Sequence, residues 1–187
     1  MLVHHGLFWR TEPLVVDRRL RGRLAALFAG DISLVAYHLA LDAHPEIGNN
    51  AQLADRLGVA KERPFGRIGI GGTVSPALTI DELAQRVQEV VDREPLVFAE
   101  GHSRIERVAI STGSAGHDLI AAAHEGYDCF VTGEPEEPSL QAARELGIHL
   151  IAAGHYATER LGVQALGGRI AAEFGVGCQF VEVANPV

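Results

Sequence analysis

The sequence predicts an α/β protein in which helices pack on mostly parallel sheets. Short apolar segments typical of buried strands recur through the second half of the chain, and Ala-rich segments with helical spacing separate them. Strands that alternate with helices form parallel sheets covered by those helices. The 187 residues, of which 47% are hydrophobic and 21% charged, have globular composition and suit one large or two small domains.

The first third of the chain predicts two helices and one strand. Apolar side chains recur at helical spacing over Arg18–Ala29, which predicts a helix. The apolar run at residues 32–36 (ISLVA) predicts a buried strand. A second helix is predicted over Asn49–Leu57, after a Gly-Asn turn and before a stop at Gly58.

The remaining elements follow in order. Residues 66–72 (GRIGIGG) predict a short strand. Thr79 predicts the N-cap of a helix that runs to about Val91, with Glu82 as its capping-box partner. Residues 95–101 (PLVFAEG) predict another strand. Four further apolar segments predict strands joined by Ala-rich helices: residues 105–111, 128–132, 149–153 and 179–183.

Charge and cysteine content exclude several classes of protein. The chain carries 24 acidic and 16 basic side chains, and no basic run exceeds Arg18-Arg19, which argues against a nucleic-acid surface. Cys129 and Cys178 lie in apolar segments without CxxC spacing, which predicts buried, reduced thiols. No apolar run approaches the roughly 18 residues of a membrane span, and the N-terminus lacks the pattern of a signal peptide. We therefore expect a cytoplasmic protein without membrane contact.

Histidines and carboxylates gather at predicted strand ends and in the turns that follow. The chain opens with the adjacent pair His4-His5, and the segment HLALDAH, with His38 and Asp42, follows the strand predicted at residues 32–36. The segment GHYATE places His155 and Glu159 four residues apart, on one face of a helix. In an open α/β sheet the binding crevice lies beyond the carboxyl ends of the strands, so we expect these side chains to meet there.

This residue combination favours a metal centre. Imidazole and carboxylate groups together suit zinc, iron, manganese, cobalt or nickel, and one carboxylate between two ions can bridge them. Adjacent histidines that diverge at a strand end can each serve a different ion. Taken singly, His155 and Glu159 have an alternative as a solvated surface pair, and His38 and Asp42 as turn or capping residues.

The glycine-rich turn at residues 112–116 (TGSAG) gives a weaker signal. Gly113 and Gly116 are candidates for binding a phosphate through backbone N–H groups, although a tight turn is the simpler explanation. Glu134, after the next predicted strand, is expected to line the same crevice and to bind substrate with them. His117 and His124 are expected to be ordinary surface or packing residues. No GxSxG elbow or Cys–His pair indicates a covalent nucleophile.

Together, these segments resemble the Nif-three-like family, whose bacterial members are often named GTP cyclohydrolase I type 2 homologues. The double histidine, HLALDAH and GHYATE carry a similarity that covers nearly the whole chain. The resemblance implies two α/β domains, residues 1–62 and 63–187, with a dinuclear metal centre between them and a toroidal homo-hexamer. It implies His38 as a neighbour of the centre. By motif, the ligands of two divalent ions per chain are expected at His4, His5, Asp42, His155 and Glu159.

The resemblance also implies a difference from other members. They carry some tens of residues before the double histidine, whereas here it follows Met1 almost directly. We expect the chain to lack the leading β-α portion of its first domain and to leave one sheet edge uncovered.

Two functional hypotheses follow. The first is a dinuclear-metal-dependent hydrolase that uses a metal-activated water on GTP or a related nucleotide, with His38 as the catalytic proton carrier. By resemblance, the reaction is the opening of the GTP imidazole ring to dihydroneopterin triphosphate. The second is a non-catalytic toroidal metal-binding scaffold or metal chaperone that binds a protein or single-stranded nucleic acid in its channel. The acidic charge argues against the nucleic acid.

Overall fold

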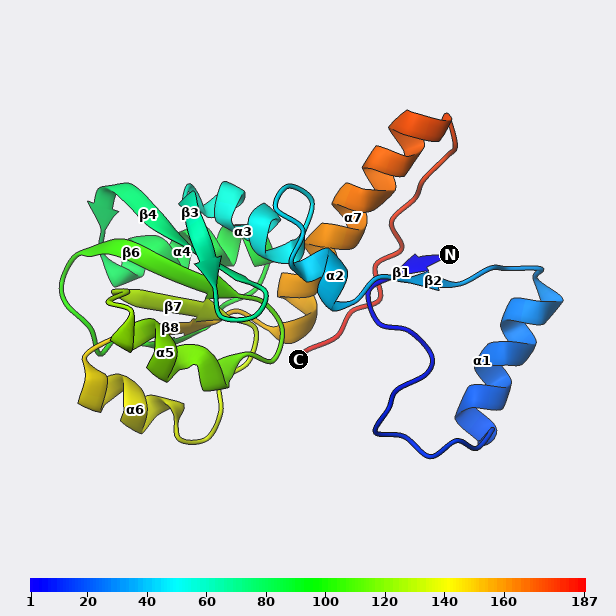
Figure 1. The fold of residues 1–187 in the computed structure, drawn as a ribbon, viewed down its shortest axis with the longest axis horizontal. Helices are drawn as coiled ribbons and strands as arrows, with labels where there is room; N and C mark the ends of the chain where they lie inside the picture. Colours follow the sequence, from blue (N-terminus) through cyan, green and yellow to red (C-terminus); the bar gives the residue numbers. More distant parts are fainter.

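A six-stranded sheet forms the centre of the larger part of the molecule in the computed structural model, which describes residues 1–187 (Figure 1). The strands lie in the order β3-β4-β6-β7-β8-β5. The pairs β6/β7 and β7/β8 are parallel, whereas β3/β4, β4/β6 and β5/β8 are antiparallel. The strand bounds are β3 Ala60–Phe65, β4 Gly69–Leu78, β5 Leu96–Phe98, β6 Ile105–Ser111, β7 Cys129–Thr132 and β8 His149–Ala152.

The predicted α/β class is confirmed, although the sheet is mixed rather than mostly parallel. The short turn at residues 66–68 joins β3 to β4, and a connection this short permits only antiparallel pairing. The sequence did not predict β3, because its residues AKERPF include three charged side chains and no apolar run; all of them except Phe65 are exposed. The predicted domain boundary, between residues 62 and 63, lies inside this strand.

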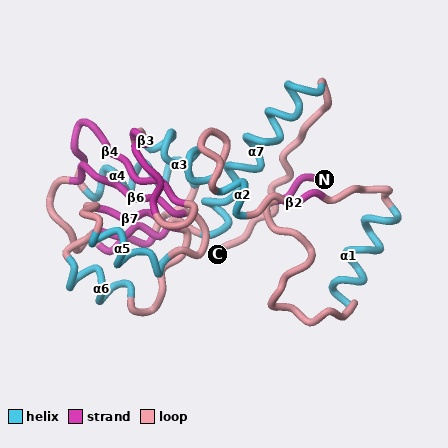
Figure 2. The backbone as a smooth tube through the Cα atoms, in the orientation of Figure 1, coloured by secondary structure: helices cyan, strands magenta, loops and turns pink.

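Helices cover both faces of the sheet and create two hydrophobic cores (Figure 2). On β7, Cys129 and Val131 enter one core and Phe130 enters the other, because neighbouring side chains of a strand point to opposite faces. The first core includes side chains of α3, α4 and α7, and the second those of α5 and α6. The helix bounds are α3 Asn49–Leu57, α4 Ile80–Val91, α5 Leu119–His124, α6 Ser139–Leu146 and α7 His155–Phe174. None of the helices combines the length and the apolar character needed to span a bilayer.

Two of these helices have the ends that the sequence predicts. The Thr79 hydroxyl accepts a hydrogen bond from the Glu82 backbone N–H (3.3 Å), and the Glu82 carboxylate accepts one from the Thr79 backbone N–H (2.7 Å). This capping box starts α4, which ends at Val91. Helix α3 stops before Gly58, whose left-handed backbone (φ +74°) suits glycine.

The N-terminal part of the chain extends away from the six-stranded sheet (Figure 1). Here β1 (Leu2–Val3) and β2 (Val35–Ala36) form a parallel pair, and α1 (Arg18–Ala29) matches its predicted bounds but has no buried side chain. The prediction of a buried strand at residues 32–36 is wrong, because both residues of β2 are exposed. Its one paired neighbour, β1, is itself only two residues long and cannot cover it. The short helix α2 (Leu39–Asp42) follows β2.

The C-terminal segment, residues 175–187, returns along α7 without joining a sheet (Figure 1). The Tyr156 hydroxyl donates to the Glu182 carboxylate (2.6 Å), and the Tyr156 backbone N–H donates to the Val187 oxygen (3.0 Å). Contacts with a helix therefore hold this segment, and the prediction of a strand at residues 179–183 is wrong.

The two cysteines lie in different surroundings. Cys129 is buried in β7, as predicted, and burial raises the pKa of its thiol far above the usual range. Cys178 is exposed, so the prediction that it is buried is wrong. The apolar residues around Cys178 belong to the unpaired C-terminal segment, which leaves the thiol uncovered.

Candidate metal centre

Strand ends and helix starts bring the predicted ligands to one place. His4 and His5 directly follow β1, while Asp42 ends α2, the helix after β2. His155 and Glu159 lie one turn apart on α7, which begins just after β8. All five predicted ligands are therefore adjacent in space, although they come from both ends of the chain.

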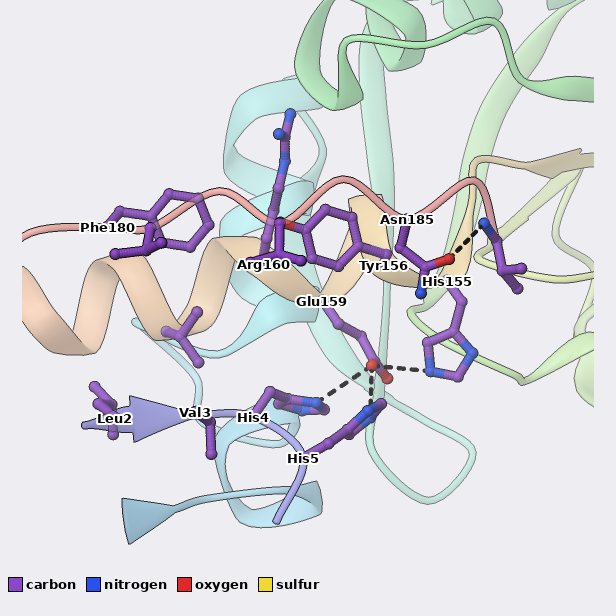
Figure 3. Close-up of a pocket in the computed structure, with 14 residues that line it drawn as sticks. Leu2, Val3, His4, His5, His155, Tyr156, Glu159, Arg160, Phe180 and Asn185 are labelled. Carbon is purple, nitrogen blue, oxygen red and sulfur yellow. Dashed lines mark hydrogen bonds and ion pairs between the residues drawn. The ribbon is translucent and has the colours of Figure 1, made fainter. Parts of the chain in front are cut away.

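One oxygen of Glu159 lies at the centre of this group (Figure 3). Its Oε2 atom is 2.9 Å from His5 Nε2, 2.9 Å from His155 Nε2 and 3.2 Å from His4 Nδ1. A carboxylate oxygen has two lone pairs, so three imidazole nitrogens exceed what it can accept in good hydrogen bonds. Three imidazole nitrogens around one anionic oxygen are a set of atoms that could bind cations once the imidazoles are deprotonated.

Asp42 contacts His4 on the side of the ring opposite to Glu159. The Nε2 atom of His4 lies 2.9 Å and 3.0 Å from the two carboxylate oxygens of Asp42. Asp42 is 1% exposed and also accepts a hydrogen bond from the Asn49 side-chain amide (2.6 Å). Burial of a carboxylate is unfavourable unless it is paired, and here two polar neighbours compensate for it.

The buried nitrogens test whether these residues suit a metal ion. His4 Nδ1 and His155 Nε2 are buried and have no hydrogen-bond partner of good geometry. Buried polar atoms rarely remain unpaired, and both nitrogens face the Glu159 carboxylate. Neutral imidazole nitrogens and carboxylate oxygens are ligands for zinc, iron, manganese, cobalt and nickel. The residues therefore fit divalent ions of this kind.

Three overlapping sets of side chains could each hold one ion. Within each set, the ligand atoms lie within 4.8 Å of one another. Two of these sets share Glu159, so this carboxylate lies where it could contact an ion in each set. We name them the aspartate set (His4, Asp42 and Glu159) and the two-histidine set (His5, His155 and Glu159). The third set consists of His4, His5 and His38.

Electrostatics couples the histidines to the carboxylates. Burial lowers the pKa of His4, but its contacts with Asp42 and Glu159 outweigh burial and raise that pKa to about 9. The close contact with the Glu159 carboxylate likewise raises the pKa of His155 to about 9, against the effect of burial. Burial raises the pKa of Glu159, but the close contacts with the three histidines outweigh it and hold this pKa far below its usual value. Protons on His4 and His155 thus supply the positive charge that balances Glu159.

His38 lies beside the histidine pair in different surroundings. Its ring centroid is 5.1 Å from those of His4 and His5, and the ring of Trp9 is 5.2 Å away. Burial, followed by the positive charges of His4 and His5, lowers the pKa of His38. Its imidazole is therefore neutral at pH 7, the state needed in a general base or a metal ligand.

The three residues predicted to bind substrate lie at different distances from the centre. A Cβ on Gly113 would lie 2.2 Å from Glu159 Oε1, so Gly113 borders the centre directly. A Cβ on Gly116 would instead meet the backbone of Glu134 and Glu136 at 2.8 Å. The Glu134 side chain contacts His155 Nδ1, so it touches a predicted ligand.

Two buried amides, Asn49 and Asn50, also belong to the surroundings of the centre and were not predicted from the sequence. Both side chains are 0% exposed at the start of α3. Asn49 links Asp42 to the backbone N–H of Gly162 on α7, while Asn50 donates to the Asp42 carbonyl (3.2 Å) and accepts from the Thr112 N–H (2.8 Å). The available signal was the pair of adjacent amides shortly after the HLALDAH segment, at the start of the predicted helix over Asn49–Leu57.

A cavity of about 430 Å³ adjoins the two-histidine set (Figure 3). Tyr156 and Arg160 of α7 form part of its wall. Apolar side chains of β1, α7 and the C-terminal segment form most of the remainder: Leu2, Val3, Val163, Phe180, Val181, Val183 and Val187. The candidate centre is therefore open to a space large enough for a small molecule.

Comparisons with known proteins identify the family. The model of the family described as Duf34/NIF3 (NGG1p interacting factor 3) matches residues 1–186. The chain belongs to this family. Curated relatives from Haemophilus influenzae and Neisseria meningitidis serogroup A are 40% and 44% identical to it. Each match covers all of this chain and 76% of the relative, and both relatives are named GTP cyclohydrolase 1 type 2 homolog.

Solved structures show the same fold. A structure titled protein ybgI, of unknown function, has a TM-score of 0.96 at 40% identity, over all of this chain and 76% of the other. TTHA1606 from Thermus thermophilus has a TM-score of 0.89 at 36% identity, over all of this chain and 75% of the other. A Bacillus cereus protein related to NIF3 is 15% identical with a TM-score of 0.80, so it supports the fold alone. The predicted family membership of this Duf34/NIF3 protein is thus confirmed.

Proposed function

We propose that this Duf34/NIF3 protein is a hydrolase that holds two divalent metal ions and acts on GTP or a related nucleotide. One observation carries the proposal: three imidazole nitrogens converge on a single carboxylate oxygen of Glu159. A structural carboxylate needs only one or two partners, whereas a shared metal ligand needs donors on both of its sides.

The aspartate set and the two-histidine set would each hold one ion, with Glu159 common to both. Divalent ions bound there would supply Lewis acidity and make water a nucleophile near neutral pH. Zinc, iron, manganese, cobalt and nickel are the candidate ions, because mixed nitrogen and oxygen ligands suit each of them.

The chain's own residues would move a proton and admit a small molecule. A ring nitrogen of His38 would accept a proton, because burial lowers the pKa of this ring and keeps it uncharged. The adjoining cavity gives access from the side of β1 and the C-terminal segment. The proposed nucleotide substrate is supported by the names of the relatives from Haemophilus influenzae and Neisseria meningitidis.

Metal content and turnover test this proposal together. Purified protein is loaded in parallel with manganese, iron and zinc, the ions per chain are measured by elemental analysis, and GTP consumption is followed. We expect about two ions per chain and metal-dependent loss of GTP. Glu159→Gln should bind neither ion firmly, whereas Glu173→Gln, an exposed change on the same helix, should behave as wild type.

Each contrary result removes a defined part of the proposal. Wild-type protein that holds two ions but hydrolyses neither GTP nor other nucleotides or phosphoesters would leave a metal-binding scaffold or chaperone as the function. Wild-type protein that takes up none of the three metals would contradict the metal centre itself.

A further inference from the structure

Two side chains outside the ligand sets hold opposite sides of the candidate metal centre. Asn49 contacts Asp42, which belongs only to the aspartate set. Glu134 contacts His155, which belongs only to the two-histidine set. The centre therefore has two separate supports, although the two sets share a carboxylate.

Asn49 fixes the Asp42 carboxylate relative to α7. Its side-chain amide donates to Asp42 Oδ1 (2.6 Å), and its own carbonyl oxygen accepts a hydrogen bond from the Gly162 N–H (2.6 Å). Asn49 is 0% exposed, so water cannot replace either bond. An amide paired at both ends in a dry interior has one orientation, and it imposes that orientation on the carboxylate.

Glu134 fixes the ring of His155. Its carboxylate contacts His155 Nδ1 and thereby places the ring proton on that atom. The other nitrogen, Nε2, then carries a free lone pair that can bind a metal ion, and it lies 2.9 Å from Glu159 Oε2. The backbone of Glu134 is itself held, because the N–H groups of Gly133 and Glu134 both donate to the Gly113 carbonyl (3.0 Å each).

From these contacts we infer that Asn49 positions the aspartate set and Glu134 positions the two-histidine set, so that each residue controls the affinity of one ion. The inference rests on the proposed metal centre. It goes further in stating that the two ions are lost separately when their supports are removed. Outer partners of metal ligands typically contribute about 10- to 100-fold to metal affinity.

The two sets differ in composition, which makes their ions distinguishable. The aspartate set contains one imidazole and two carboxylates, whereas the two-histidine set contains two imidazoles and one carboxylate. Co²⁺ bound to these sets should give different visible absorption spectra, because nitrogen and oxygen donors split its d orbitals to different extents. Co²⁺ is therefore a probe that reports which ion remains.

The test compares two supporting residues with one ligand from each set. Asn49→Ala and Glu134→Ala are titrated with Co²⁺ and Zn²⁺, beside Asp42→Ala and His155→Ala as references. We expect each supporting variant to keep one ion at wild-type affinity and to bind the other about 10- to 100-fold more weakly. The spectrum of singly loaded Asn49→Ala should match that of Asp42→Ala, and the spectrum of Glu134→Ala should match that of His155→Ala.

Matched controls separate positioning from general damage. Gln52→Ala lies on α3 with Asn49, and Glu137→Ala is an exposed change three residues after Glu134; both should bind two ions as wild type does. Glu134→Gln keeps an oxygen that can accept the His155 N–H, so it should recover most of the affinity lost in Glu134→Ala. Circular dichroism checks that each variant is folded, and Glu134, which is partly exposed, tests the inference even if Asn49→Ala unfolds.

The outcomes distinguish this inference from the proposed function. If wild-type protein binds two ions and both supporting variants lose both ions equally, or lose neither, the inference is wrong and the metal centre stands. If the matched spectra are exchanged between the variants, the assignment of supports to sets is wrong. If wild-type protein binds no Co²⁺ or Zn²⁺, the proposed centre and the inference fall together.

Discussion

A Cβ on Gly113 would lie 2.2 Å from Oε1 of Glu159, so the backbone after β6 approaches this carboxylate more closely than any side chain permits. Gly113 also has a left-handed backbone (φ +72°), which residues other than glycine rarely adopt. Its N–H donates to the Thr158 hydroxyl on α7 (3.1 Å), which holds the turn against the helix. The glycine-rich turn therefore shapes the candidate centre, whatever its role toward substrate.

Gly113→Ala should weaken metal binding, because Glu159 must move away from the added methyl group. Gly147→Ala is the control: Gly147 has a similar backbone (φ +65°), but a Cβ there meets no atom within 4 Å. Both variants should lose about 1–2 kcal/mol of unfolding free energy from backbone strain. Only Gly113→Ala should lose metal affinity, measured by Zn²⁺ titration. Equal metal binding by the two variants would show that Glu159 is not a ligand.

Metal binding should stabilise the protein more at high pH than at low pH. His4 and His155 have pKa values of about 9 in the folded chain, above the ordinary value of 6.5. Their protonation stabilises the fold fully below a pH of about 6.5, and this contribution is lost as pH rises toward about 9. A metal ion needs neutral imidazoles and must displace these protons. The rise in melting temperature caused by Zn²⁺ should therefore grow between about pH 6 and pH 9.

The measurement compares thermal unfolding with Zn²⁺ and with a chelator at each pH. His149 offers a control, because its two nitrogens are occupied by Gly101 N–H and the His102 carbonyl, at the other end of β8. This side chain belongs to none of the candidate ligand sets and should therefore contribute nothing to the zinc effect. A zinc-induced shift that stays constant over this pH range would mean that protonated histidines do not compete with the metal.

The sequence predicted the candidate centre better than it predicted the strands. His155 and Glu159 were placed together by helical spacing, a local pattern that needs no knowledge of distant partners. The capping box at the start of α4 was predicted for the same reason. His4, His5 and Asp42 were expected at the same sheet edge, but they follow the strands of a separate two-stranded sheet. The family resemblance, rather than the rule for strand ends, therefore predicted the full set of ligands.

The errors concern features that depend on distant parts of the chain. Residues 179–183 have strand propensity, but a strand also needs a neighbour to pair with, and no local pattern supplies one. Residues 35 and 36 do pair with β1, but no other part of the chain buries them. Conversely, β3 has a polar sequence yet pairs with β4 through a short turn. Asn49 was overlooked because its partner on α7, Gly162, lies 113 residues later.

His38→Ala should slow turnover without removing an ion. If His38 carries a proton during the reaction, its loss should reduce kcat by about 10²- to 10⁴-fold while the metal content stays at the wild-type value. His44→Ala is a suitable control, because the His44 ring accepts hydrogen bonds from the N–H groups of Glu46 and Ile47 (3.2 Å each) and points to a turn. Loss of an ion from His38→Ala would instead assign His38 as a ligand, in agreement with the third candidate set.

The N-terminal part of the chain, which extends away from the six-stranded sheet, exposes an apolar surface that predicts self-association. Leu14, Val15 and Val16 are 101%, 61% and 66% exposed, and Phe28 on α1 is 79% exposed. Monomeric proteins rarely expose so many large apolar side chains close together in the chain. The family resemblance implies a toroidal homo-hexamer, and we propose that this surface is buried against further copies of the chain.

We expect light scattering at micromolar concentration to detect an oligomer and no stable monomer. Replacing both Leu14 and Phe28 by Glu should shift the mass toward the monomer, because charged side chains oppose burial in an apolar contact. Ile120→Glu is the control. Ile120 is half exposed on α5, which covers the face of the six-stranded sheet opposite to α3 and α7 and lies outside the N-terminal surface. Wild-type protein that remains monomeric, or a double variant with unchanged mass, would show that this surface does not hold copies together.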